Sequence, residues 1–213
     1  MAPGAAPALQ QFLQVVPPDD AQAWQTLAAA WGARVPDGAS ACAALPAEGL
    51  QCYRNRRAGL ALVRQIDRPV LLRLHPSSAQ DASVAVVLRQ LDGPSATLEA
   101  GGHTLRVSVA ELAQVWRGDL ATLWRSPHQL PDSGNLADSP AGAAWLDSQW
   151  AQAGLGDSGM SGAAPLTPAQ RRTRIHQFQL TQGLTPDGWA GPLTLMLLNR
   201  AVGVNEPRLR NGA

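Results

Sequence analysis

The apolar residues in the first part of the chain recur at the spacing of helices. In segment 21–32 they lie three or four positions apart, which predicts a helix. Asp19 or Asp20 can cap its start, and Gly32 can end it. A short helix followed by an extended piece is expected over 41–52, and a further helix over 57–66. The residues expected to face the core in the two longer helices are Trp24, Leu27, Ala28, Trp31, Leu60, Leu62, Val63 and Ile66.

From residue 69 onwards the pattern changes to that of strands. The runs 69–74, 83–93, 95–102 and 103–108 are short and rich in β-formers, and Asp-Gly and Gly-Gly pairs mark turns between them. Because the connections are too short for parallel crossovers, these runs predict an antiparallel sheet of hairpins. A helix is expected over 107–116, with Ser108 and Glu111 in the capping-box arrangement, and another strand over 120–125 follows Gly118. The fold class is therefore α+β.

The last third of the chain returns to helical spacing. Residues 126–142 are rich in Pro, Ser, Gly and Asp and lack apolar periodicity, which indicates a linker. Helices are expected over 143–155 and over 167–184, the latter with Thr167 as cap and Pro168 at the first position. Segment 185–201 is expected to form an Asp-Gly turn followed by a third helix. Their expected buried residues are Trp145, Leu146, Trp150, Leu155, Ile175, Phe178, Leu180, Leu193, Met196 and Leu197. We place a first domain at 8–128, the linker at 129–138 and a small three-helix bundle at 139–206.

The composition narrows the possible partners. Of the 213 residues, 45% are hydrophobic and 15% charged, which excludes a disordered chain. The formal net charge of +1 provides no basic field, so no nucleic-acid partner is expected. No run of 18 apolar residues occurs, so no membrane span is expected in this region. All 17 basic residues are Arg, and without Lys the chain cannot form the phosphate-binding loop of an ATPase.

Two features bear on the cellular compartment. The first 14 residues lack the basic and continuous apolar segments of a secretory signal, so the chain is either cytosolic or a piece of a longer protein. Cys42 and Cys52 can form a disulfide, remain two buried thiols or contribute a nucleophile. A zinc site would need two further ligands, and the four His are scattered singly, so neither a metal nor a cofactor is expected.

The tail carries the most specific motif of the chain. Its members are Phe178–Gln179, Gly183–Leu184, Asp187–Gly188, Trp189, Gly191, Thr194 and Leu198–Asn199. This pattern resembles the second half of the peptidoglycan-binding domain, a three-helix module attached to many bacterial cell-wall enzymes, and segment 143–155 resembles the first helix of that module. The match covers roughly residues 134–205. Gly183 and Gly188 suit turns that need a positive φ, and Asp187 can hydrogen-bond its own turn.

The resemblance implies peptidoglycan as the ligand. Uncharged glycans with short peptides are commonly gripped by aromatic faces and amide side chains rather than by salt bridges. Phe178 is expected in the core, whereas Trp189 is either core or an exposed stacking platform. The arginines at 171, 172 and 174 are interpreted as a solvated helix face. The candidate peptidoglycan-binding residues are Arg174, Gln179, Asp187, Trp189 and Asn199.

A second resemblance extends over nearly the whole chain. The stretch 107–127, with 42–52 and 67–74 upstream, resembles the periplasmic part of the general secretion pathway protein A family. In that family an ATPase domain and one membrane helix precede this region. The resemblance implies a periplasmic location and a fold related to the double-glycine leader peptidases, which are papain-like cysteine peptidases.

The residues that such a peptidase needs are absent or altered. A papain-like site combines a thiolate at a helix N-terminus, a His base and an Asp or Asn that orients the His. Segment 19–23, where the family's Cys opens the first helix, contains no Cys; Ser83 stands at the His position and Glu99 at the Asp position. His103 is expected at the surface. We therefore expect an inactive peptidase-like domain with no catalytic residues, and Cys42 and Cys52 are then better interpreted as a disulfide formed in the periplasm.

Together these resemblances imply a non-catalytic peptidoglycan-anchoring region of a type II secretion assembly protein. Such a region would help the outer-membrane secretin assemble through the cell wall, with an inner-membrane protein as partner. Two alternatives stay open. The chain could be a cysteine peptidase or amidase targeted to the cell wall, or a protein–protein interaction module without glycan affinity.

Overall fold

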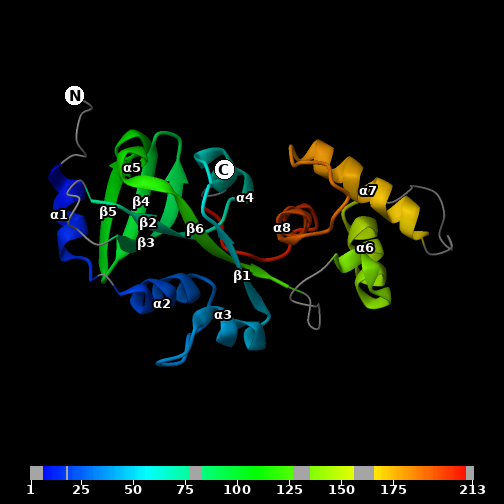
Figure 1. Ribbon diagram of the computed structural model, residues 1–213, viewed down its shortest axis with the longest axis horizontal. Helices are drawn as coiled ribbons and strands as arrows, with labels where there is room; N and C mark the ends of the chain where they lie inside the picture. Colours follow the sequence, from blue (N-terminus) through cyan, green and yellow to red (C-terminus); the bar gives the residue numbers. More distant parts are fainter. Residues whose placement is uncertain (1–6, 18, 77–82, 127–134, 156–165, 210–213) are drawn as a thin grey trace. The chain divides into compact units, whose positions relative to one another are not determined.

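The computed structural model describes residues 7–17, 19–76, 83–126, 135–155 and 166–209 (Figure 1). The chain falls into two compact units. The first unit runs to Trp124 and is joined again by the tail from Glu206, whereas the second unit spans Arg125–Asn205. Within the described ranges, no helix is both long and apolar enough to cross a membrane.

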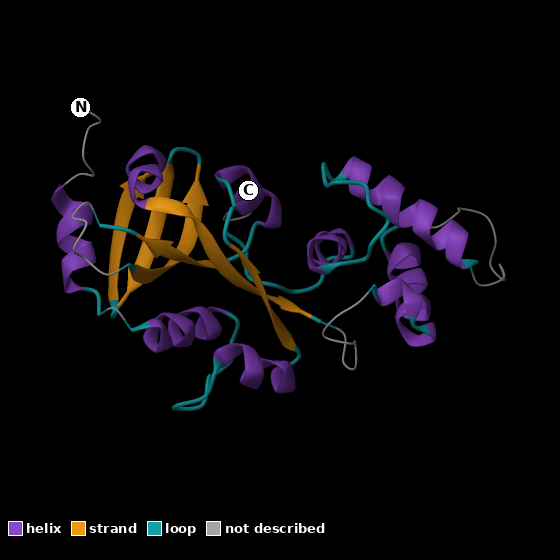
Figure 2. Ribbon diagram, in the orientation of Figure 1, coloured by secondary structure: helices purple, strands orange, loops and turns teal. Residues whose placement is uncertain are grey.

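A sheet runs through the first unit (Figure 2). The described residues form six strands in the order β1-β6-β2-β3-β4-β5, and the pairings from β6 through to β5 are antiparallel. The predicted α+β fold with an antiparallel sheet is therefore confirmed. The strands are β1 (Leu50–Asn55), β2 (Val70–Leu74), β3 (Val84–Asp92), β4 (Ser95–Ala100), β5 (His103–Ser108) and β6 (Trp116–Arg125).

Helix α2 (Asp20–Ala30) packs on one face of this sheet. Asp19 caps the helix by accepting a hydrogen bond from the N–H of Ala21 at 2.8 Å. Because residues two apart on a strand share a face, the sheet residues under α2 are the odd-numbered ones of β2, β3 and β6. The core between them holds Trp24, Leu27, Ala28, Trp31, Leu71, Ala85, Val87, Ala121 and Leu123, so the predicted buried face of this helix is confirmed.

Five shorter helical segments complete the first unit. They are α1 (Pro7–Val15), α3 (Ala41–Ala44), the 3-10 turn η1 (Leu45–Glu48), α4 (Leu60–Ile66) and α5 (Val109–Val115) in the described part of the chain. The predicted capping box of α5 is present. The N–H of Ser108 donates to Glu111 at 2.7 Å, and the N–H of Glu111 donates to the Ser108 hydroxyl at 3.1 Å. Hydrogen bonds with the side chain and then the backbone of Ser108 hold the pKa of Glu111 below its ordinary value.

The described part of the second unit contains the 3-10 turn η2 (Leu136–Asp138) and the helices α6 (Pro140–Gln152), α7 (Pro168–Thr181) and α8 (Pro192–Ala201). Each of the three helices begins with a Pro, which has no N–H to leave unpaired there. Trp150 of α6 and Phe178 of α7 meet edge to face, with ring centroids 5.0 Å apart. Both side chains are buried, as the periodicity predicts.

Three element boundaries differ from the sequence-based expectation. Residues 7–15 form helix α1, which the sequence analysis left unassigned. Strand β6 begins at Trp116, directly after α5, and not after Gly118. Helix α6 begins at Pro140, inside the stretch interpreted as a linker, because the Ser139 side chain caps it through the N–H of Gly142 at 3.0 Å.

Three side chains are also placed differently from the expectation. Leu180 is 56% exposed, since it lies two positions after buried Phe178 and so about 200° around the helix. Leu155 is 46% exposed, because it follows the end of α6 and no longer continues the helical face. Arg171 is not solvated: its Nε and Nη2 donate to the carboxylate of Asp147 at 3.1 and 2.8 Å. Helical spacing alone could not reveal this partner on α6.

A buried ion pair attaches the tail to the rest of the first unit. Arg68 Nη2 lies 2.7 Å from Glu206 Oε2, and both side chains are fully buried. The N–H of Leu91 on β3 donates to the carbonyl of Leu209 at 3.1 Å, and Leu209 is itself buried. The chain therefore contributes to the core of the first unit again after residue 205.

Replacing Glu206 with Ala is expected to lower the free energy of unfolding by about 3–5 kcal/mol, because Arg68 would stay buried without its partner charge. Glu99→Ala is the control, since it removes a partly exposed ion pair with Arg89 and is expected to cost less than about 1 kcal/mol. Urea unfolding followed by circular dichroism measures both losses. Equal losses in the two variants would contradict the special role of the buried pair.

Candidate functional site

A polar cluster surrounds an arginine of the central sheet in the first unit. Arg73 of β2 forms an ion pair with Asp20 in the first turn of α2. Its Nη1 donates to the Ser83 hydroxyl at 3.2 Å, and its Nε lies 3.9 Å from Asp119 Oδ2. We call Asp20, Arg73, Ser83 and Asp119 the Arg73 cluster. Asp20 lies on α2, Arg73 on β2 and Asp119 on β6, and Ser83 directly precedes β3.

The register of the sheet brings these residues to the α2 face. Arg73 follows Leu71 by two positions, and Leu71 lies in the core under α2, so both belong to the same face of β2. Asp119 precedes Ala121 by two positions on β6, and Ala121 pairs with Leu71. Arg73 and Asp119 therefore continue the apolar face of the sheet towards the start of α2.

A glycine shapes the strand where Asp119 lies. The pairing of β2 with β6 is irregular between Leu72 and Leu74, at the position of Gly118 on β6. Gly118 has a φ of +95°, and a Cβ at this position would lie 2.9 Å from the carbonyl oxygen of Ala58. Only glycine suits both the conformation and the close approach. The bulge thus sets the path of the backbone immediately before Asp119.

A pocket of about 230 Å³ opens beside the Arg73 cluster. Its lining residues are Asp20, Trp24, Arg54, Arg56, Leu71, Arg73, Asp119, Leu120 and Ala121. The guanidinium carbon of Arg54 lies 5.3 Å from the centre of a Trp24 ring, which is the geometry of a cation–π contact. The pocket thus has an apolar floor from the sheet and charged walls of both signs.

The Arg73 cluster contains two of the positions at which the leader-peptidase resemblance expects catalytic residues. Asp20 belongs to the segment expected to supply the Cys, Ser83 stands at the His position, and both side chains bind Arg73. Glu99, at the third position, forms an ion pair with Arg89, with Oε2 3.2 Å from Nε. His103 is exposed on β5. Among the residues that the structure describes, no three His, Cys, Asp or Glu side chains are grouped to hold a metal ion.

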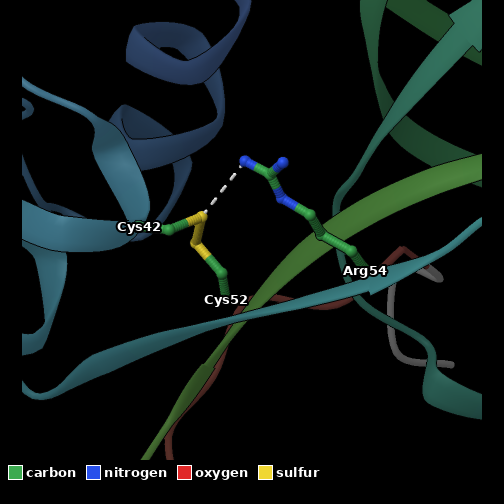
Figure 3. The surroundings of a disulfide bond; sticks show 3 residues. All are labelled: Cys42, Cys52 and Arg54. Carbon is green, nitrogen blue, oxygen red and sulfur yellow. Dashed lines mark hydrogen bonds between the residues drawn. A yellow bond between two sulfur atoms is a disulfide. The ribbon is translucent and has the colours of Figure 1, made fainter. Parts of the chain in front are cut away.

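The two cysteines lie at the edge of the same region (Figure 3). The structure joins Cys42 of α3 to Cys52 of β1 in a disulfide, which is partly buried against the core under α2. Arg54 follows Cys52 by two positions on β1, and its Nη2 donates to Cys42 Sγ at 3.5 Å. Arg54 therefore links the disulfide to Trp24, and Arg54 and Trp24 both line the pocket.

The second unit holds the tail motif, which is organised by the amide of Gln179. This side chain is 2% exposed, and its Nε2 lies within hydrogen-bonding distance of Asp187 Oδ1, the Trp189 carbonyl and Thr194 Oγ1, at 2.7, 3.0 and 3.0 Å. Its Oε1 accepts from the N–H of Gly188 at 2.9 Å. One buried amide thus fixes the loop between α7 and α8 at several points.

The Gln179 network leaves the Trp189 ring exposed. Trp189 is 45% exposed, and its backbone N–H donates a hydrogen bond to Asp187 Oδ1 at 2.8 Å. A Cβ at Gly191 would lie 2.8 Å from Cζ3 of the indole, so the ring rests directly on the Gly191 backbone. Of the two possibilities for Trp189, the structure therefore has the exposed one. One part of the indole therefore rests on the Gly191 backbone, and the rest of the ring is accessible to a ligand.

The remaining two candidate residues lie elsewhere in this unit. Asn199 is buried on α8, and its Nδ2 donates to the carbonyl of Arg125 at 2.8 Å. Arg174 precedes Gln179 by five positions on α7, a rotation of about 140° around the helix. It lines a separate pocket of about 330 Å³ together with Leu166, Ala169, Gln170, Thr173 and Gln177. The structure thus brings together Gln179, Asp187 and Trp189, but not Arg174 or Asn199.

The chain is similar in sequence to a known secretion protein. No family model matches it. It is 29% identical over 205 residues to "General secretion pathway protein A" of Aeromonas hydrophila. The chain is homologous to General secretion pathway protein A. The match covers 93% of this chain but only 35% of that relative's length.

A solved structure agrees with this homology. The fold is similar to the crystal structure of a periplasmic domain of the EpsAB fusion protein of the Vibrio vulnificus type II secretion system, with a TM-score of 0.54 and 27% identity. That match covers 89% of this chain and 82% of the other. A peptidase C39-like domain from Vibrio parahaemolyticus matches with a TM-score of 0.33 and 16% identity, a likeness too slight to support an argument. The resemblance to the general secretion pathway protein A family, drawn from the sequence motifs, is thus confirmed.

Sequence reasoning missed the residue at the centre of the Arg73 cluster. Arg73 is the one charged residue in the otherwise apolar run of β2, and a charge inside such a run needs partners. This signal pointed to a polar cluster on the sheet. It could not identify Asp20, Ser83 and Asp119 as the partners, because these lie far apart in the sequence.

The disulfide predicts the behaviour of the cysteines in solution. In the untreated protein, alkylation is expected to modify neither Cys42 nor Cys52, and the intact mass should be two hydrogens below that of the reduced chain. Cys42→Ser with Cys52→Ser is expected to lower the free energy of unfolding by about 2–4 kcal/mol. Mass spectrometry and urea unfolding measure these effects. Alkylation of both thiols without a reductant would disprove the pairing.

Gln179→Ala is expected to lower the free energy of unfolding of the second unit by about 2 kcal/mol, because the Gly188 N–H and the other groups in the network would lose a buried partner. Gln177→Ala is the matched control, since this exposed amide on the same helix should cost less than about 0.5 kcal/mol. Thermal and urea unfolding give both values. A Gln179 variant as stable as the Gln177 variant would refute a supporting role for the network.

Proposed function

We propose that the chain is the periplasmic, non-catalytic peptidoglycan-anchoring region of a type II secretion assembly protein. In this role it helps the outer-membrane secretin assemble through the cell wall, together with an inner-membrane partner protein and the secretin machinery. Homology to General secretion pathway protein A over 93% of the chain supports the secretion role. The similarity to a periplasmic domain of EpsAB supports both that role and the compartment.

The exposed indole of Trp189 is the observation that carries the anchoring part of the proposal. A tryptophan that is 45% exposed leaves a large apolar face in water, and such faces are favoured where a ligand covers them. The Gln179 network and Gly191 hold the ring in place before any ligand arrives, which reduces the entropy lost on binding. The net charge of +1 suits a ligand that is mostly sugar.

The five candidate binding residues take different roles in this proposal. Trp189 and Asp187 are exposed and can touch the ligand. Gln179 is buried and acts as a positioning residue for both. Asn199 is buried as well and supports the fold through the Arg125 carbonyl. Arg174 lines its own pocket on α7, where it can contact a stem peptide of the same polymer.

The non-catalytic part of the proposal rests on the first unit. The chain contains two cysteines, and the disulfide engages both, so neither is available as a thiolate nucleophile. Asp20 and Ser83, at two expected catalytic positions, are both bound to Arg73. These contacts favour anchoring over the alternative of a cysteine peptidase or amidase.

Sedimentation with purified insoluble peptidoglycan sacculi tests the anchoring role. The chain is expected to sediment with sacculi, and Trp189→Ala is expected to weaken binding by about 30-fold, the loss typical of an aromatic residue central to an interface. The matched control is Leu180→Ala, because Leu180 is 56% exposed in the same unit but lies outside the loop. This control should bind like the unaltered protein.

Two other outcomes would overturn the proposal. Failure to sediment at any salt concentration would leave the interaction module without glycan affinity as the better interpretation. Release of soluble muropeptides, abolished by Cys42→Ala or Cys52→Ala, would establish the enzyme instead. Circular dichroism of each variant confirms that a loss of sedimentation is not a loss of folding.

A further inference from the structure

Two arginines that line the pocket beside the Arg73 cluster have no carboxylate partner in the described part of the chain. Arg54 and Arg56 are two positions apart, and both are exposed. No ion pair among the residues that the structure describes involves Arg54 or Arg56. The two acids of this pocket, Asp20 and Asp119, already face Arg73. The pocket therefore has positive charge left over for a ligand.

One of these arginines is held in place. The Arg54 guanidinium lies over a Trp24 ring, with its carbon 5.3 Å from the ring centre. It also donates to Cys42 Sγ at 3.5 Å (Figure 3). A guanidinium fixed on both sides loses little conformational freedom when it binds an anion. Arg56 stands beside it without such contacts in the described structure and can reach towards a ligand. Together they can grip the two oxygens of one carboxylate.

The size of the pocket indicates a single side chain rather than a whole small molecule. At about 230 Å³ it lies below the range of about 300–1,000 Å³ that is usual for small-molecule sites. A second pocket of about 330 Å³ adjoins it and shares Trp24 and Arg54. Its other lining residues include Gln25, Val35, Pro36, Asp37 and Ser40. An extended peptide can place one side chain in each pocket and cross the ridge of Trp24 and Arg54 between them.

The acids of the two pockets argue against a polyanion such as nucleic acid. Asp20 and Asp119 line the first pocket and Asp37 lines the second. A polymer with a negative charge on every unit would be repelled by these carboxylates at close range. A peptide with isolated acidic side chains can keep its charges away from them. The N–H groups of such a peptide can in turn donate to the exposed oxygens of Asp20 or Asp119.

From these observations we propose that the two pockets dock an extended acidic segment of a partner protein, with one carboxylate side chain bound by Arg54 and Arg56. The recognition element is a Glu or Asp flanked by small or apolar residues, since Leu71 and Ala121 of the sheet face under α2 line the pocket. This surface lies in the first unit and is independent of peptidoglycan binding through Trp189. A failure of either proposal leaves the other standing.

Fluorescence anisotropy with a labelled decapeptide of alternating Glu and Ala tests this docking surface. Saturable binding to the intact chain at about 0.1 M salt is expected, with at least fivefold weaker binding of the matched peptide of alternating Gln and Ala, because each bound carboxylate makes charge-assisted hydrogen bonds. Arg56→Gln should weaken binding of the Glu peptide about fivefold, and Arg54→Gln should weaken it at least as much.

Arg57→Gln is the matched control, since it removes the same charge from the neighbouring exposed residue that does not line the pocket. It should change the affinity by less than about twofold. Equal weakening by Arg56→Gln and Arg57→Gln would overturn the proposal, because only the net charge would then matter. So would equal binding of the Gln peptide, or tighter binding of a single-stranded decanucleotide that depends on Arg56 in the same way.

Discussion

The packing of α2 against the sheet is the constraint on which the chemistry of the first unit depends. Trp24, Leu27 and Ala28 bury one side of the helix on β2, β3 and β6, and burial of large apolar side chains contributes about 1.5–3 kcal/mol each. This contact fixes the start of the helix, and with it Asp20, over Arg73. The same helix turns Trp24 towards Arg54, so one apolar interface positions both the ion pair and the cation–π contact beside the pocket.

The second unit uses a buried polar group for the same purpose. Gln179 cannot be replaced by an apolar residue without leaving the Gly188 N–H unpaired, because this amide is the partner of several loop groups at once. The result is an aromatic side chain that is exposed and yet fixed. In both units, then, the exposed residue that a ligand can reach (Arg54 or Trp189) differs from the buried residue that holds it in place (Trp24 or Gln179). A sequence motif contains exposed and buried residues alike and does not show which is which.

This distinction explains how far the sequence could predict the structure. Local signals predicted helix α2, the capping box at Ser108 and the antiparallel hairpins, because spacing and turn residues depend on neighbours in the chain. The relation of Arg171 to Asp147, or of Arg73 to Ser83 and Asp119, depends on helix and strand packing and left no local trace. The motif grouped Gln179, Asp187 and Trp189 correctly as neighbours, yet it could not reveal that Gln179 is buried. Contacts between side chains that are far apart in the sequence therefore could not be predicted from it.

The ion pair of Asp20 and Arg73 differs chemically from the pair on which a cysteine peptidase depends. A thiolate beside an imidazolium is a pair of opposite charges whose proton can move, because the His pKa lies near neutrality. A carboxylate beside a guanidinium is again a pair of opposite charges, but arginine stays protonated at every physiological pH and cannot act as a base. Asp20 and Arg73 therefore place two fixed opposite charges at the start of α2, where the packing of this helix on the sheet holds them together. Fixed charges of this kind can hold the polar groups of a ligand.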